Sequence, residues 1–292
     1  MTAVAGDAAA TAAWQPSLPP ARTIELAERG HLVVREVAGP PGAPVLILLH
    51  GWTATSDLNW YPVFDALGAQ YRVIAFDHRG HGRGIRTRRA FRLRDCADDV
   101  IAVADALGVA RFTPVGYSMG GTVASLLWLH HRERVEALVL CATACRFADT
   151  RVVRTQMGVF RPAAWVARAL PLRYGRPLFD KLIWRRTKDR GLRQWIIEEI
   201  TSGDPRHVIE AGNELRAFDS RGWVPAINVP VSVVLIEHDS ILPTRLQEEL
   251  VSTLSRPRVF PIDGDHDVCV RNPQLFTDTL LSACAAAIPG AP

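Results

Sequence analysis

The sequence Arg111-Phe112-Thr113-Pro114-Val115-Gly116-Tyr117-Ser118-Met119-Gly120-Gly121 carries the strongest structural signal in the chain. Apolar residues lead into a Gly-x-Ser-x-Gly motif centred on Ser118, and a helix-like run over residues 122–130 follows it. A strand, a sharp turn and a helix in this order hold a serine in strained backbone with its hydroxyl exposed. Gly116 and Gly120 provide small neighbours for such a turn, and Gly121 lets the outgoing helix approach the strand. The alternative is a glycine-rich turn with an incidental serine, so the motif needs support from the rest of the chain.

Strand-like and helix-like segments alternate on both sides of this motif. Short apolar runs, typical of strands buried on both faces, occupy 45–49, 72–76, 112–115, 135–140, 229–236 and 258–262. Helical patterns occupy 57–67, 95–107, 122–130, 244–254 and 273–287. Alternating polar and apolar residues predict two antiparallel edge strands at 23–28 and 31–37. The whole pattern predicts an α/β fold with a mostly parallel, doubly wound sheet.

Reactive side chains gather where the predicted strands end. They are His50, Asp77, Ser118, Asp239 and His266. In open parallel sheets, ligands bind and react beyond the carboxyl ends of the strands. So many reactive residues at these positions predict an enzyme.

The composition is that of a mildly basic globular protein. The 292 residues are 48% hydrophobic, which predicts one large domain with an insertion. The net charge is +4 without a lysine-rich tail, so no nucleic-acid partner is expected. Residues 1–22 lack the basic and apolar regions of a signal peptide, which predicts a disordered leader. No apolar run approaches the length of a membrane span.

The cysteines predict neither disulfides nor a metal site. Their number is odd and their spacing is not that of a disulfide framework, which indicates reduced thiols in a cytoplasmic protein. They are Cys96, Cys141, Cys145, Cys269 and Cys284. The pair at 141 and 145 lacks a nearby His–Cys pair to complete four ligands, so neither a metal nor another cofactor is expected.

A helical segment replaces the strand pattern over 146–224 and divides the core into 23–145 and 225–288. Its first part is basic, with Arg146, Arg151, Arg154, Arg161, Arg168, Arg173, Arg176, Lys181, Arg185, Arg186, Lys188, Arg190 and Arg193. One interpretation is a helical cap with arginines on its outer face and aromatic side chains lining a pocket. The other is a surface for an anionic lipid or an acyl-CoA-like carrier. The aromatic and leucine content predicts an apolar acyl or aryl group in the substrate.

Five sequence pieces together resemble the α/β-hydrolase family, and the resemblance covers about residues 24–288. The pieces are His50-Gly51, Asp77-x-Arg79-Gly80-His81-Gly82, Gly116-x-Ser118-x-Gly120-Gly121, Asp239 before Pro243, and His266-Asp267. They follow the family's order of nucleophile, acid and histidine. The resemblance implies the α/β-hydrolase fold, with a helical cap inserted after the sixth strand, in a serine esterase- or lipase-like member.

Three positions depart from the family pattern. Gly84 stands where this subgroup often has serine, and Asp265 precedes the histidine where glycine is common. Pro114 lies inside a predicted central strand and removes a hydrogen bond from the ladder, so a bulge or a break in pairing is expected. None of the three removes a catalytic group, although Asp265 is placed to perturb His266.

Three residues are the candidates for a catalytic triad. Ser118 is the predicted nucleophile, and His266 is the predicted general base that takes its proton. Asp239 is preferred as the acid that orients the histidine, with Glu237 as its competitor because both leave the same strand. The aspartates that flank the histidine are less suited to this role, because their own loop favours solvated or turn-forming positions. They are Asp263, Asp265 and Asp267.

The backbone N–H groups of Trp52 and Met119 are the candidates for an oxyanion hole. Trp52 follows His50-Gly51 at the end of one strand, and Met119 follows the candidate nucleophile. His50 is predicted to brace its loop rather than act as a base. A second bracing network of hydrogen bonds is predicted for Asp77, Arg79 and His81.

Serine at position 118 points to acyl transfer. Haloalkane dehalogenases and epoxide hydrolases of this fold attack with aspartate there, so both are excluded. The predicted reaction is cleavage of a small-molecule carboxylic ester through an acyl-enzyme that water then hydrolyses. A carbon–carbon bond hydrolase, a lactonase and a perhydrolase remain as alternatives that share the triad. A ligand receptor without turnover remains as an alternative from another class.

Overall fold

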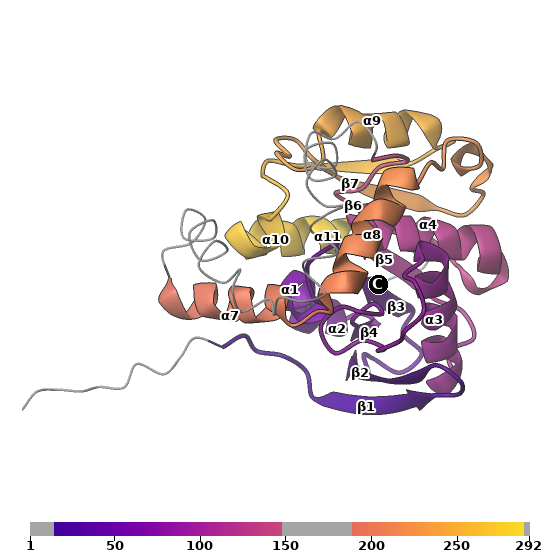
Figure 1. Cartoon of the computed structure of the whole chain (residues 1–292). Helices are drawn as coiled ribbons and strands as arrows, with labels where there is room; N and C mark the ends of the chain where they lie inside the picture. The colour runs from indigo at the N-terminus through magenta and orange to yellow at the C-terminus, as the bar shows by residue number, and fades with distance from the viewer. Residues whose placement is uncertain (1–14, 148–188, 289–292) are drawn as a thin grey trace, which may run out of the picture.

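One sheet runs through the molecule, and the computed structural model describes it within residues 15–147 and 189–288 (Figure 1). The strands are β1 (Ala21–Leu26), β2 (Gly30–Val37), β3 (Val45–Leu49), β4 (Arg72–Phe76), β5 (Thr113–Tyr117), β6 (Leu138–Cys141), β7 (Val231–Ile236) and β8 (Arg258–Ile262). They form an 8-stranded sheet in the order β1-β2-β4-β3-β5-β6-β7-β8. The β1–β2 and β2–β4 pairs are antiparallel and the others are parallel, which confirms the predicted sheet and its edge hairpin.

Helices connect these strands. They are α1 (Ser56–Trp60), α2 (Phe64–Gly68), α3 (Leu93–Ala106), α4 (Met119–His131), α7 (Arg190–Thr201), α8 (Pro205–Ala217), α9 (Thr244–Thr253), α10 (Val268–Arg271) and α11 (Pro273–Ala287). The single helix predicted over 57–67 is wrong. Pro62 lies between α1 and α2, and a proline inside a helix lacks the N–H for the ladder and crowds the preceding turn.

The predicted leader ends earlier than expected. β1 begins at Ala21, so the boundary placed at residue 22 is wrong. Leu18 packs against the buried core, and the carbonyl of Pro19 accepts a hydrogen bond from the Arg35 guanidinium. The chain is therefore already attached to the sheet before β1. Residues 1–14 of the predicted leader lie outside the described residues.

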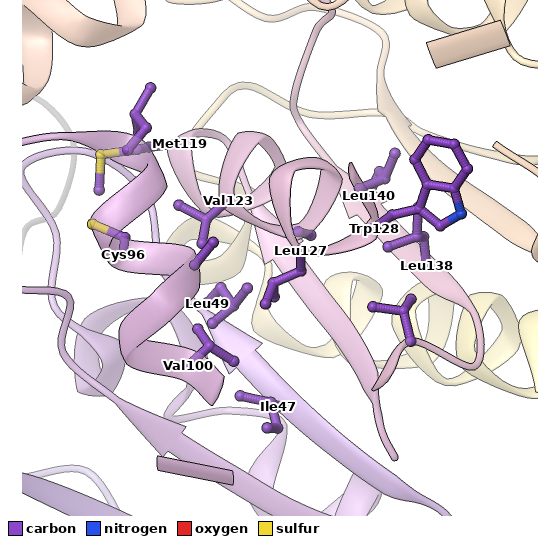
Figure 2. Close-up of a cluster of buried hydrophobic side chains, with 14 of the residues drawn as sticks. Ile47, Leu49, Cys96, Val100, Met119, Val123, Leu127, Trp128, Leu138 and Leu140 are labelled. Carbon is purple, nitrogen blue, oxygen red and sulfur yellow. The ribbon is translucent and has the colours of Figure 1, made fainter. Parts of the chain in front are cut away.

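Side chains at alternate strand positions build a core on each face of the sheet. Figure 2 shows one face, where Ile47 of β3 meets Val100 of α3 and Leu127 of α4. On the other face, Leu46 and Leu48 belong to a cluster with side chains of α2 and α11. The predicted continuous apolar runs follow from this arrangement, because strands covered on both faces need apolar side chains at every position.

Pro114 interrupts the ladder between β5 and β6, as predicted. It is paired with β3, while the regular pairing of β5 with β6 begins one residue later. The pairs Phe112–Val135 and Val115–Val139 bracket the break. Val115 lies three positions after Phe112, but Val139 lies four positions after Val135, so the segment leading into β6 has one extra residue. The result is a β-bulge just before the motif that carries Ser118.

The segment predicted to form the cap lies between β6 and β7. Its described helices are α7, which packs on α1, and α8, which packs on α3 (Figure 1). Most of the basic residues named above fall within 148–188, outside the described residues. Every helix within 15–147 and 189–288 is too short or too polar to span a bilayer.

Candidate active site

The turn between β5 and α4 holds Ser118 in strained backbone. Its φ of 53° and ψ of −113° lie in a region that residues with a side chain rarely adopt. A Cβ at Gly116 would lie 2.3 Å from the Gly120 carbonyl oxygen, and a Cβ at Gly120 would lie 2.0 Å from the Leu49 carbonyl oxygen. Both glycines are therefore sterically required, as the motif predicts. Ser118 is 8% exposed at the resulting turn.

The structure brings Ser118, His266 and Asp239 together from three loops. His266 Nε2 lies 3.1 Å from Ser118 Oγ, and His266 Nδ1 lies 2.7 Å from Asp239 Oδ2. The carboxylate side chain of Asp239 is fully buried, and the imidazole of His266 is 13% exposed. An Nδ1–H donated to the carboxylate leaves Nε2 as the acceptor for the serine hydroxyl. This arrangement can deprotonate Ser118 as it attacks.

Asp239, rather than Glu237, is the acid beside the histidine. Glu237 lies two residues earlier, directly after β7, and is exposed. The N–H groups of Ile241 and Leu242 donate to Asp239 Oδ1 at 2.9 and 2.6 Å. The side-chain amide of Gln247, which is fully buried in α9, donates to Asp239 Oδ2 at 2.9 Å. These three donors fix the orientation of the carboxylate beside His266.

Three hydrogen bonds that the sequence did not predict hold the histidine loop. The Tyr117 hydroxyl donates to the His266 carbonyl at 2.7 Å. Asp265 Oδ1 accepts hydrogen bonds from the N–H of Ser240 at 2.8 Å and from the N–H of His266 at 2.7 Å. Asp265, which departs from the family pattern, therefore joins the His266 loop to the loop that carries Asp239. A strand or loop pattern alone does not reveal such contacts between distant segments.

Trp52 lines the pocket above Ser118, and Met119 directly follows Ser118 in the chain. Met119 is the first residue of α4, where helix geometry leaves the N–H without an intrahelical acceptor. A Cβ at Gly51 would lie 3.4 Å from Ser118 Cβ, so the loop that carries Trp52 runs beside the serine. Asn59 Oδ1 accepts from the Gly51 N–H at 2.7 Å and fixes this loop. The oxyanion hole at these two N–H groups stays a prediction.

His50 braces the loop, as predicted. Its Nε2 accepts from the His78 N–H at 2.9 Å, which leaves Nδ1 to donate to the Gly51 carbonyl at 2.8 Å. The ring is fully buried, and this burial lowers its pKa below 6.5. A neutral ring with both nitrogens hydrogen-bonded is a structural group. It is not available as a second base.

Asp77, Arg79 and His81, predicted to form one hydrogen-bond network, belong to two separate sets of contacts. Asp77 accepts from the N–H groups of Ser56 and Arg83 at 2.6 and 2.7 Å, and so ties two loops together. Arg79 instead forms a two-point ion pair with Asp99 of α3, at 2.7 and 2.6 Å. His81 Nδ1 lies 3.2 Å from the Arg79 carbonyl.

Gly84, the second departure from the family pattern, has a steric reason. A Cβ at this position would lie 2.2 Å from the His78 carbonyl oxygen. It would also lie 2.5 Å from the carbonyl oxygen of Asp77. Serine does not fit this loop, because the clash is with backbone atoms that have no rotamer to change.

A cavity of about 370 Å³ opens above Ser118 and His266. Its lining is mostly apolar, with Ala54, Leu58, Leu192, Ile196, Ile200 and Val270. Asp267 and Arg271 also reach it, and they form an ion pair with each other at 3.1 Å. The pocket therefore offers a hydrophobic site directly beside the serine hydroxyl.

Cys269 also lines the pocket, but its thiol is not a competing nucleophile. Burial raises its pKa to about 12, so the thiol stays protonated near neutral pH. All five cysteines are free and buried. Within the described part of the chain, no group of three or more His, Cys, Asp or Glu side chains is arranged to hold a metal ion.

Known proteins share both the sequence pattern and the architecture. A family model described as alpha/beta hydrolase fold matches residues 44–163. A protein of Caulobacter vibrioides named "Putative carbamate hydrolase RutD" is 28% identical, over 84% of this chain and 91% of its own length. The 3-oxoadipate enol-lactonase 1 of Acinetobacter baylyi is 24% identical, over 85% of this chain and 91% of its own length.

Solved structures extend the likeness to the whole fold. An enol-lactonase from Burkholderia xenovorans superimposes with a TM-score of 0.76 at 24% identity, over 90% of this chain and 100% of its own. A thermophilic esterase from Thermogutta terrifontis gives a TM-score of 0.72 at 24% identity, over 91% and 98%. The family model, the relatives, the solved structures and the strand order agree, so the chain has the α/β-hydrolase fold.

Proposed function

We propose that this protein is a serine hydrolase that cleaves a carboxylic ester with an apolar acyl or aryl group through an acyl-enzyme. The observation that carries the proposal is the position of His266, hydrogen-bonded to both Ser118 and Asp239 beside a mostly apolar pocket. A serine hydroxyl is a weak nucleophile until a base accepts its proton, and the imidazole provides that base. The buried carboxylate stabilises the imidazolium that forms.

In the first half-reaction, Ser118 Oγ attacks the acyl carbon while its proton moves to His266 Nε2. The carbonyl oxygen becomes an oxyanion, and the N–H groups of Trp52 and Met119 are the proposed donors to it. When the tetrahedral intermediate collapses, the bond from the acyl carbon to the alcohol oxygen breaks. The alcohol leaves with the proton from His266, and the acyl group stays on Ser118.

In the second half-reaction, His266 takes a proton from water as the water oxygen attacks the acyl carbon. The new intermediate collapses by breaking the bond to Ser118 Oγ, which recovers its proton from His266. The products are a carboxylic acid and the free enzyme. Each proton therefore travels through one ring nitrogen, Nε2 of His266.

A lactone is the second candidate substrate. A lactone is a cyclic ester, so its cleavage uses the same two half-reactions and the same groups. A specific finding favours it, because both the curated relatives and the solved structures include an enol-lactonase. The pocket volume of about 370 Å³ also suits a compact ring.

Hydrolysis of a graded p-nitrophenyl ester series, with lactones beside it, tests the proposal. Wild-type protein is expected to hydrolyse the apolar esters or the lactones, and Ser118→Ala is expected to lose about 10⁴- to 10⁶-fold in kcat. A fluorophosphonate probe should label wild type at Ser118 and leave the variant unlabelled. Wild type that neither hydrolyses these compounds nor reacts with the probe would be a receptor instead of an enzyme.

A further inference from the structure

One face of the cap helix α7 forms a wall of the pocket. Leu192, Ile196 and Ile200 line the cavity and are spaced four residues apart, so they form one stripe along the helix. Ile196 also packs in a small apolar cluster with Leu58 of α1. The distance of this stripe from Ser118 therefore depends on how α7 sits on α1.

Glu199, one turn beyond Ile196, joins α7 to the core. Its Oε2 accepts a hydrogen bond from the Thr55 hydroxyl and lies 3.0 Å from Arg83 Nη2. Thr55 is the N-cap of α1 and also accepts from the Leu58 N–H at 3.2 Å. The Glu199 side chain is only 12% exposed. A hydrogen-bonded carboxylate at this depth fixes the helix on the N-terminus of α1.

Among residues 15–147 and 189–288, the site around Glu199 holds more negative than positive charge. Arg83 lies 2.9 Å from Asp57 and 3.3 Å from Asp77, besides its contact with Glu199. Arg35 pairs with Asp57 at 2.6 Å, so two guanidiniums face three carboxylates. Burial raises the pKa of Glu199, and this effect outweighs the lowering by the Thr55 hydrogen bond and the Arg83 charge, while the negative charges of Asp57 and Asp77 add to the rise. The oxygen that accepts from Thr55 therefore contributes to docking, while the negative charge itself opposes it.

We infer that Glu199 is a positioning residue for substrate selectivity: its hydrogen bond to Thr55 seats α7, so that the apolar stripe contacts the substrate's apolar group. Glu199 faces the core and does not line the pocket. The inference rests on the proposed function, because it concerns how that site recognises its ester. It assigns chain-length selectivity to a polar contact outside the pocket.

Three variants of α7 test this assignment. Glu199→Ala removes the acceptor, and Glu199→Gln keeps an acceptor oxygen while it removes the charge. Glu198→Ala is the matched control, because Glu198 is exposed on the same helix, and within the described residues its side chain bonds to Gln194 of that helix at 3.0 Å. The first readout is the ratio of kcat/KM for p-nitrophenyl hexanoate to that for the acetate, in which an effect common to both esters cancels.

The expected ratio falls about tenfold in Glu199→Ala, mainly through KM for the hexanoate, as for about two lost methylene contacts. Its acetate kcat/KM should stay within about twofold of wild type. Glu199→Gln and Glu198→Ala should both keep the wild-type ratio. A Glu199→Ala ratio equal to that of wild type overturns the inference, and so does a Glu199→Gln ratio as low as that of Glu199→Ala.

Hydrogen–deuterium exchange across residues 190–201 tests the same inference without turnover. Amides of α7 should exchange about tenfold faster in Glu199→Ala than in wild type, and at the wild-type rate in the other two variants. Unchanged exchange in Glu199→Ala overturns the inference. Absence of hydrolysis by wild type would instead count against the proposed function, and the exchange result would still judge the role of Glu199.

Discussion

Two groups of residues line the pocket, and they differ in chemistry. The first group, here called the sheet side, consists of Ser118, His266 and Asn59. Hydrogen bonds join His266 to Ser118 and Asp239, and Asn59 to the Gly51 N–H. Leu192, Ile196 and Ile200 come from the cap and meet the cavity through apolar contacts alone. Hydrogen bonds fix the geometry of bond cleavage, while apolar contacts discriminate by size. The sheet side should therefore govern kcat, and the cap side should govern selectivity.

After Ser118→Ala, the largest loss of kcat is expected from replacing Asp239, the carboxylate beside His266. Asp239→Asn should lower kcat by about 10³- to 10⁴-fold, because the amide favours the wrong tautomer of the histidine. Steady-state kinetics on the preferred ester measures this. Glu237→Gln is the control, because Glu237 is exposed at the end of the same strand. Equal losses in the two variants would show that Asp239 is not the orienting acid.

A smaller loss is expected at the oxyanion loop. Asn59→Leu removes the acceptor for the Gly51 N–H and should lower kcat about 10- to 100-fold with little change in KM, because the donors to the oxyanion move. Cys269→Ala removes the acceptor 3.6 Å from Asn59 Nδ2 but leaves the Gly51 contact, so its effect should be much smaller. A wild-type kcat in Asn59→Leu would contradict this role for the loop.

The cap side should respond in selectivity instead of rate. Ile196→Ala enlarges the pocket and should shift the preference towards bulkier acyl groups by about two- to tenfold. Ile197→Ala is the matched control, because both residues are 7% exposed but only Ile196 lines the pocket. Profiles of kcat/KM over the ester series measure the shift. An identical shift in both variants would mean that general loosening of α7, and not the wall, sets the preference.

The smallest expected effect is a pH dependence of protein stability that arises from the buried histidines His50 and His81. Burial lowers the pKa of His50 below 6.5, and it lowers the pKa of His81 to about 3. As the pH falls, these histidines take up protons in the unfolded chain at a higher pH than in the folded protein. The free energy of unfolding should therefore be at its full value above pH 6.5 and fall as the pH drops towards 5. Tm measured across this range should show the fall. His81→Gln should flatten it, while replacement of His238, whose side chain is 74% exposed, should not.

The sequence predicted the parts of this molecule that local patterns determine. The serine turn, the antiparallel edge hairpin and the bulge at Pro114 follow from steric rules that act over a few residues. Pro62 lies inside the single helix predicted over 57–67 and argues against it. A proline in a helical pattern marks a break, and here it separates two short helices.

Other parts depended on contacts between segments far apart in the chain. Gln247, Asn59 and Glu199 are single polar residues on helices, where a solvated position is the usual expectation. Each is instead buried against a loop more than five residues away, and no spacing in the sequence marks its partner. Such residues hold the triad and the cap in position without belonging to a motif.

The central claim is an acyl group carried by Ser118 between two half-reactions. Rapid mixing with p-nitrophenyl butyrate, acid quenching within the first turnover and peptide mapping by mass spectrometry test it most directly. The account predicts one butyryl group on the peptide that contains Ser118, formed as fast as p-nitrophenol is released. Release of p-nitrophenol with no acyl group on that peptide, or with the group on another residue, would contradict it.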